Sequence, residues 1–115
     1  TEWSDLELAW VVAAHTKSNA VVIARDGAAV GVGAGDQSRV GAAARALVRA
    51  GDRALGAAAA SDAFFPFRDG IDLLAEAGVR VIAEPGGSMR DKEAIEAAEQ
   101  HGIALVFTGR RHFRH

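Results

Sequence analysis

The sequence predicts a three-layer α/β domain whose sheet is mostly parallel and contains one antiparallel hairpin. Short apolar runs alternate with helical segments along the chain, which is the order typical of βαβ units. The dipeptide Asp26-Gly27 between two apolar runs is a strong signal for a hairpin turn. Strands that are joined through helices pair in parallel by right-handed crossovers, so we expect helices on the faces of the sheet.

The first half of the chain is expected to form a helix, the hairpin and a second helix. Residues 4–7 have the capping-box pattern Ser-x-x-Glu and should open a helix that ends near Thr16. Its expected apolar face consists of Leu6, Trp10, Ala13 and Ala14. Residues 20–24 and 28–32 are the expected hairpin strands. Ser38 should cap the second helix and Gly51 should end it. Its expected core stripe consists of Val40, Ala43, Ala44, Leu47 and Val48.

The second half repeats a strand–helix order. The expected strands are residues 57–60, 79–83 and 103–107. Asp69 should cap the helix that ends at Gly78, because a carboxylate can accept the first N–H groups of a helix. Ser88 and Asp91 should open the last helix in an S-x-x-D arrangement, and Gly102 should end it.

Composition bounds the classes of protein to which the chain can belong. With 115 residues, half of them hydrophobic and 24% charged, residues 1–115 fit one soluble globular domain. A net charge of −2 argues against a nucleic-acid partner. The absence of Cys excludes disulfides and Cys-ligated metal and fits a cytoplasmic protein. No apolar run approaches the roughly 20 residues of a membrane span. The chain starts at Thr1 rather than Met, and we expect it to be a piece of a longer protein.

An aromatic loop follows the strand predicted at residues 57–60. Three of the five Phe residues and one of the two Pro residues fall between Ser61 and Gly70. Pro66 restricts both its own backbone and that of Phe65, so the loop should be stiff. A loop between a strand and a helix is where open α/β sheets place ligands. The alternative is that these Phe side chains only fill the edge of the core.

The glycine run Gly31-Val32-Gly33-Ala34-Gly35 lacks the spacing of a nucleotide-binding motif, so we interpret it as close backbone packing. Arg39 then lies at the start of a helix, where the helix dipole disfavours a cation. An anion that also contacts the backbone N–H groups would explain its position there. A solvated arginine is the alternative.

Two further segments have a functional and a structural interpretation. Pro85-Gly86-Gly87-Ser88 could face the aromatic loop across one cleft, or be an ordinary strand-to-helix turn. Arg110 and Arg111 could bind a phosphate, or belong to a frayed basic tail. The four His residues show no metal-binding spacing, so no metal is expected, and His101 should lie at a helix C-terminus.

Taken together, residues 17–20, 31–40, 61–69, 85–88 and 107–115 resemble one known family. It is the family of bifunctional purine-biosynthesis enzymes that combine AICAR formyltransferase with IMP cyclohydrolase. The resemblance covers essentially the whole chain, and its most specific motif is Ser-Asp-Ala-Phe-Phe-Pro-Phe. It implies that residues 1–115 are the C-terminal subdomain of the transformylase region, with a cytidine-deaminase-like α/β fold.

The resemblance also implies an activity, transfer of a formyl group from the co-substrate 10-formyltetrahydrofolate to AICAR. The residues implied for AICAR are Asn19, Arg39 and Arg111. Those implied for the folate are Val40, Phe64, Asp69, Ser88 and Met89. An aromatic ring suits a flat ligand ring, a carboxylate accepts pterin hydrogen bonds or polarises the formyl donor, and a guanidinium suits phosphate.

The family's catalytic Lys-His pair lies upstream, and no Lys-His dipeptide occurs in this sequence. No catalytic residue is therefore expected here apart from a supporting role for Asp69, and the chain alone should lack transformylase activity. The implied partners are AICAR, a reduced folate, the upstream part of the same enzyme and a second copy in a homodimer. Two alternatives remain open: a standalone folate- or nucleotide-binding module, and a structural or dimerisation domain.

Overall fold

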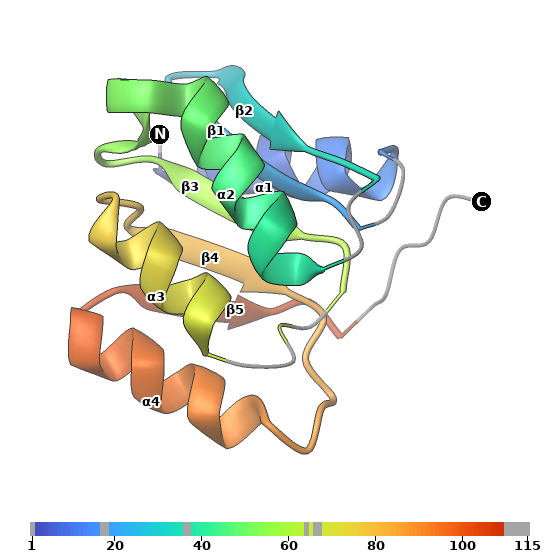
Figure 1. Ribbon diagram of the computed structural model, residues 1–115, viewed down its shortest axis with the longest axis vertical. Coiled ribbons are helices and arrows are strands. Elements are labelled where there is room, and N and C mark those ends of the chain that lie inside the picture. The colour runs from blue at the N-terminus through green and yellow to red at the C-terminus, as the bar shows by residue number, and fades with distance from the viewer. Residues whose placement is uncertain (1, 17–18, 36–37, 64, 66–67, 110–115) are drawn as a thin grey trace.

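The computed structural model describes residues 2–16, 19–35, 38–63, 65 and 68–109. The elements in these ranges are α1 (Glu2–Ala14), β1 (Val21–Arg25), β2 (Ala28–Gly33), α2 (Arg39–Ala50), the 3-10 helix η1 (Gly51–Ala54), β3 (Ala58–Ser61), α3 (Asp69–Glu76), β4 (Val81–Glu84), α4 (Asp91–His101) and β5 (Ala104–Phe107). The five strands form one sheet in the order β2-β1-β3-β4-β5 (Figure 1). The α/β class predicted from the sequence is confirmed.

The sheet is mixed rather than mostly parallel. β3, β4 and β5 pair in parallel, whereas β1 pairs antiparallel with both β2 and β3. The predicted hairpin is confirmed, and both residues of its turn, Asp26 and Gly27, have positive φ as a tight hairpin turn requires. The antiparallel β1–β3 pairing was not expected. In this pairing β1 lies between β2 and β3 and runs antiparallel to the other four strands of the sheet.

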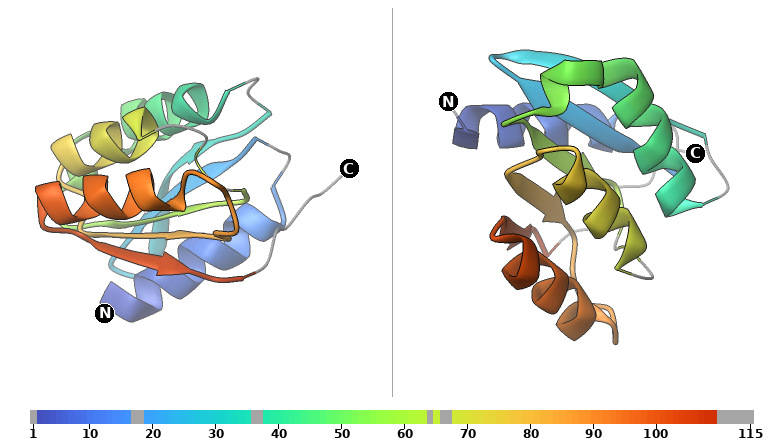
Figure 2. Two further views of the ribbon diagram at one scale, coloured as in Figure 1. Left: turned by 90° about the horizontal axis from the view of Figure 1, so that it is seen from below. Right: turned by 60° about the vertical axis from the view of Figure 1, so that its left-hand side comes forward.

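Helices cover both faces of the sheet (Figure 2). The helix α1 packs on one face with Leu6 and Ala9, above Val22 and Val81. The helices α2, α3 and α4 lie on the other face, where the core includes the fully buried Ile23, Ile71, Leu74 and Ile82. Successive residues of β1 therefore point into different cores, which is why its sequence is continuously apolar. None of the helices in the described ranges has the length and apolar character of a membrane span.

The contact between α2 and β2 is made almost without side chains. A Cβ atom added to Gly33 would lie 1.9 Å from the carbonyl oxygen of Ala42, and one added to Gly31 would lie 2.1 Å from that of Ala46. The predicted close backbone packing at these glycines is thus confirmed. The predicted core stripe of α2 is wrong in part, because the helix turns its smallest residues to the sheet. Its buried residues are Arg39, Ala42, Ala43, Ala46 and Ala50, and Val48 is 82% exposed.

The helix ends agree with the sequence signals in most places. Ser38 caps α2 by accepting the N–H of Gly41 at 3.0 Å. Gly102 ends α4 in the left-handed conformation, with His101 in the last turn as predicted. The capping box at Ser4 is wrong, because α1 already begins at Glu2. Asp69 is the first residue of α3 rather than its cap, and its carboxylate accepts the N–H of Gly70.

We expect Gly33→Ala to lower the free energy of unfolding by more than about 3 kcal/mol, because the added methyl group overlaps a backbone oxygen that cannot rotate away. Gly102→Ala is the control: it has open space for a Cβ but a φ of +68, so it should cost only about 1–2 kcal/mol of backbone strain. Urea denaturation of both variants measures the difference. Equal losses would contradict the close contact of α2 with β2.

Candidate functional site

One edge of the sheet collects five segments that are far apart in the sequence. Because β1 runs against the other strands, its amino end lies at the same edge as the carboxyl ends of β2, β3, β4 and β5 (right-hand side of Figure 1). Residues before β1 therefore meet residues that follow the other four strands. Open α/β sheets bind ligands at such an edge.

The predicted site residues within the described ranges all belong to this edge. Asn19 precedes β1, Arg39 and Val40 open α2, Asp69 opens α3, and Ser88 and Met89 follow β4. Asn19 and Arg39 are in direct contact. Asp69 and Met89 are exposed, and Val40 and Ser88 are half-buried. The predictions for Phe64 and Arg111 fall outside the described residues.

The Arg39 guanidinium is the centre of a buried polar network. Its Nη1 donates to a carboxylate oxygen of Asp62 and, at 3.2 Å, to the carbonyl oxygen of Ala20. Its Nη2 donates to Oδ1 of Asn19 at 2.8 Å. The same oxygen of Asp62 accepts the N–H of Ala20 at 3.1 Å. Three segments, from before β1, the start of α2 and the end of β3, are therefore held together through one guanidinium.

This network excludes one of the two interpretations of Arg39. The side chain of Arg39 is only 7% exposed and that of Asp62 is 0% exposed, so the interpretation of Arg39 as a solvated residue is wrong. The positive charge at the start of α2 is compensated by Asp62 from within the chain. Breaking such a buried pair by removing one partner leaves an uncompensated charge in a medium of low dielectric constant. The position of Arg39 is therefore rigidly determined.

Glu84 is a second buried carboxyl group at this edge, and among the described residues no cation contacts it directly. It is the last residue of β4 and is 1% exposed. Its Oε2 accepts the N–H of Phe65 at 3.2 Å, and its Oε1 finds no hydrogen-bond partner among the described residues. Burial raises the pKa of Glu84 to about 7, and the charge of Asp91 adds to this, while the Phe65 N–H and Arg39 oppose it.

The two loops that follow β3 and β4 are fixed by separate contacts. In the first loop, the buried ring of Phe65 lies so close to Gly70 that a Cβ there would come within 2.5 Å of the ring. In the second, both carboxylate oxygens of Asp91 accept N–H groups, from Gly87 at 2.8 Å and Ser88 at 3.1 Å. The predicted S-x-x-D arrangement is present only in part: Asp91 accepts the N–H of Ser88, but α4 begins at Asp91, so Ser88 does not cap the helix.

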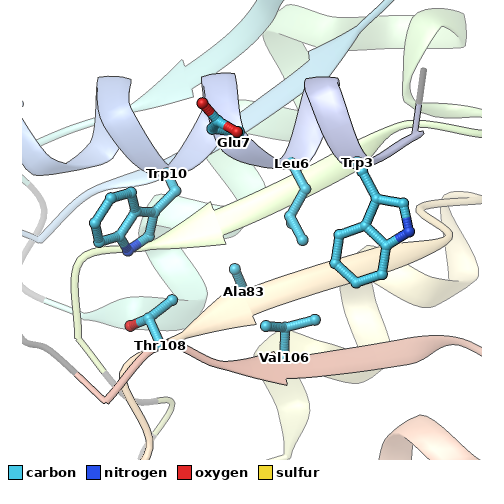
Figure 3. A pocket seen from close by; sticks show the side chains of 7 residues that line it. All are labelled: Trp3, Leu6, Glu7, Trp10, Ala83, Val106 and Thr108. Atoms are coloured by element: carbon cyan, nitrogen blue, oxygen red, sulfur yellow. The ribbon is translucent and has the colours of Figure 1, made fainter.

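A groove of about 210 Å³ lies on the face of the sheet that α1 covers, between α1 and the strands β4 and β5. Figure 3 shows Trp3, Leu6 and Trp10 hanging from α1 above the strands that carry Ala83 and Val106. The lining is mostly apolar, and none of the predicted site residues contributes to it. The polar edge around Arg39 and Glu84 is therefore the candidate site. Within the described residues, no three His, Cys, Asp or Glu side chains are arranged to hold a metal ion.

Asp62 and Glu84 were not predicted as site residues. Each is an acidic residue placed directly after an apolar run, Asp62 after the strand at 58–61 and Glu84 at the end of the run from Val79. An acidic side chain at the carboxyl end of a buried strand is the sequence signal that could have identified both. Their partners could not be read from it, because Arg39 and Phe65 come from other elements.

The relatives of this chain are bacterial purine-biosynthesis proteins. It is 57% identical over 114 residues to the bifunctional purine biosynthesis protein PurH of Anoxybacillus flavithermus, and 56% identical to that of Shouchella clausii. A family model described as the AICARFT/IMPCHase bienzyme matches residues 1–49. Residues 1–49 are thus similar to the AICARFT/IMPCHase bienzyme family, and nearly the whole chain is similar to PurH. The matches cover 99% of this chain but only 22% of each relative, so the chain spans about a fifth of their length.

The fold of this chain recurs in solved structures of other proteins. The deaminase/reductase of Thermotoga maritima matches with a TM-score of 0.64 at 16% identity, over 92% of this chain and 36% of that one. RibD of Acinetobacter baumannii (form 2) matches with a TM-score of 0.60 at 20% identity, over 91% and 34% of the two chains. At these identities the likeness concerns the fold alone.

We expect Asp62→Asn to lower the free energy of unfolding by about 3–5 kcal/mol, since it leaves the Arg39 charge buried without its counter-ion. Asp26→Asn makes the same chemical change at an 82% exposed carboxylate beside Arg25, and should change stability by less than about 1 kcal/mol. Thermal and urea denaturation measure both. A loss for Asp62→Asn no larger than for Asp26→Asn would argue against the buried pair.

Stability should also depend on pH through Glu84. Unfolded, this acid ionises near its usual pKa of 4.5; folded, it ionises near 7. Between these values the folded state keeps a proton that the unfolded state has lost, so wild-type stability falls as the pH rises from about 4.5 to about 7. Glu84→Gln removes this loss and should stabilise the protein by up to roughly 3 kcal/mol at pH 8.

At pH 4 the Glu84→Gln variant and the wild type should be almost equally stable, because both then carry a neutral side chain. Glu99→Gln, at an exposed position of α4, is the matched control and should have little effect at either pH. Urea denaturation at pH 4 and pH 8 separates the cases. A stabilisation by Glu84→Gln of the same size at both pH values would show that ionisation is not its cause.

Proposed function

We propose that this chain is the C-terminal subdomain of an AICAR formyltransferase, and that its parent protein also carries IMP cyclohydrolase activity. The observation that carries the proposal is the 57% identity to PurH, which extends over 114 residues without restriction to one motif. A three-layer, cytidine-deaminase-like arrangement of residues 1–115 fits this proposal. So does the deaminase-like fold of the solved neighbours.

In the proposed reaction the 5-amino nitrogen of AICAR attacks the formyl carbon of 10-formyltetrahydrofolate. A nitrogen–carbon bond forms, the bond from that carbon to N10 of the folate breaks, and the proton that the amine gives up is balanced by one that N10 gains as tetrahydrofolate leaves. Asn19 and Arg39 would contact AICAR, with Arg111 at its phosphate. In support, the Arg39 guanidinium is fixed by Asp62 and Ala20 before any ligand arrives, so little side-chain entropy is lost on binding.

The folate would lie along the two loops that follow β3 and β4. Val40, Phe64, Asp69, Ser88 and Met89 are the proposed contacts. Asp69 is exposed at the start of α3, where its carboxylate can accept hydrogen bonds from a pterin or polarise the formyl donor. The fully exposed Met89 offers a flexible apolar contact at the same edge.

The proton acceptor is proposed to lie outside this chain. The sequence contains no Lys-His dipeptide, and general-base catalysis by a positioned residue contributes about 10²–10⁴-fold to rate. The partners of the chain would then be the upstream part of the same enzyme and a second copy in a homodimer. A cytoplasmic location agrees with purine biosynthesis and with the lack of Cys.

The full-length protein that contains this chain should form formyl-AICAR from AICAR and 10-formyltetrahydrofolate, whereas the purified 115-residue chain should form none. Absorbance of the released tetrahydrofolate follows the reaction, and circular dichroism checks that the short chain is folded. Formyl-AICAR from the short chain would refute the placement of the base. Tight calorimetric binding of AICAR or a folate to the isolated monomer would instead favour a standalone binding module.

A further inference from the structure

Glu84 joins both loops of the proposed folate edge. Its main chain leads into Pro85, and its carbonyl oxygen accepts the N–H of Thr108 at 2.8 Å, which fixes the end of β4 to the segment after β5. Its side chain reaches the other loop, where Oε2 accepts the N–H of Phe65 at 3.2 Å. One residue thus connects the ends of β3, β4 and β5.

The contact with Phe65 continues to the start of α3. Phe65 is 3% exposed, and its ring occupies the space where Gly70 has no side chain. The N–H of Gly70 donates to Oδ1 of Asp69 at 2.9 Å. A shift of the Phe65 peptide would therefore displace the residue against which Gly70 packs, and with it the backbone that carries Asp69.

We propose that Glu84 is a positioning residue that holds the peptide of Phe65 and so determines how tightly this edge binds the folate co-substrate. The inference rests on the proposed function, because it concerns the same edge. Glu84 is buried and touches no ligand itself. It acts through Phe65, Gly70 and Asp69.

The acid form of Glu84 is the one that suits this position. Its Oε2 accepts from Phe65, and its Oε1, which has no partner among the described residues, can carry the proton. Among the described residues, the charged groups that act on it are Asp91 of α4 and Arg39 of α2, the latter already paired with Asp62. Loss of the proton strengthens the bond from the Phe65 N–H, but it also places in the core a charge that this bond and Arg39 only partly compensate, so the buried edge around Glu84 must rearrange to hydrate that charge.

The test uses the full-length enzyme with Glu84→Leu, Glu84→Gln and the exposed control Glu99→Gln. The Michaelis constants for 10-formyltetrahydrofolate and for AICAR are measured between pH 6 and pH 8.5. Glu84→Leu loses the acceptor for the Phe65 N–H, and should raise KM for the folate roughly three- to tenfold while KM for AICAR stays within about twofold. Glu99→Gln should match the wild type throughout.

Glu84→Gln keeps an acceptor but cannot ionise. At pH 6 its KM for the folate should equal that of the wild type. From pH 6 to 8.5 the wild-type KM should rise and that of Glu84→Gln should stay level. Should Glu84→Leu fail to fold, as judged by circular dichroism, the comparison of wild type with Glu84→Gln decides alone.

Identical pH profiles for wild type and Glu84→Gln overturn the inference, and so does an equal rise of both Michaelis constants in Glu84→Leu, which indicates general damage. These results leave the proposed function intact, since the wild type transfers formyl groups in each case. A full-length wild type that forms no formyl-AICAR removes the proposed function, and this inference with it.

Discussion

The structure depends on one charge held in a dry interior. Arg39 is buried at the start of α2, where its guanidinium is stabilised by Asp62, the carbonyl oxygen of Ala20 and the side chain of Asn19. This arrangement needs α2 close to the sheet, which the glycines of β2 allow, and it needs the amino end of β1 beside the carboxyl end of β3. The antiparallel β1–β3 pairing places these two strand ends side by side.

Two buried carboxyl groups at the same edge face opposite conditions. Asp62 has a guanidinium within direct contact, whereas Glu84 has one backbone N–H and the more distant charge of Arg39. Desolvation therefore dominates at Glu84 and raises its pKa. Asp62, in contrast, forms an ion pair with Arg39. One carboxyl group maintains the position of a cation, and the other responds to pH in the neutral range.

Local signals in the sequence were sufficient wherever a few neighbouring residues decide the structure. The Asp26-Gly27 turn, the Ser38 cap and the Gly102 helix end depend on backbone conformations that those residue types favour, and all three are present. The buried face of α2 could not be predicted this way. Hydrophobicity favours Val48, but contact with a glycine strand requires the smallest residues, and that requirement is set by β2.

The sequence predicted that the segments of the candidate site meet at one edge, but it did not predict the contacts between their side chains. Asn19, Arg39, Asp69 and Ser88 come from segments that meet at one edge, as expected for loops of a common sheet. The contacts of Asp62 with Arg39 and of Glu84 with Phe65 join residues 23 and 19 positions apart. Such pairs follow from strand order and strand direction, and the inverted β1 was the part of the topology that the sequence pattern did not indicate.

The insertion of β1 between β2 and β3 also bears on how the chain folds. Val21 of β1 pairs with Ser61 of β3. The centre of the sheet can therefore form only when two segments about 40 residues apart in the sequence come together. The clamp on Arg39 uses atoms from both sides of that pairing. The polar edge around Arg39 therefore requires the pairing that has the largest sequence separation in the sheet, and closing that loop costs the most chain entropy.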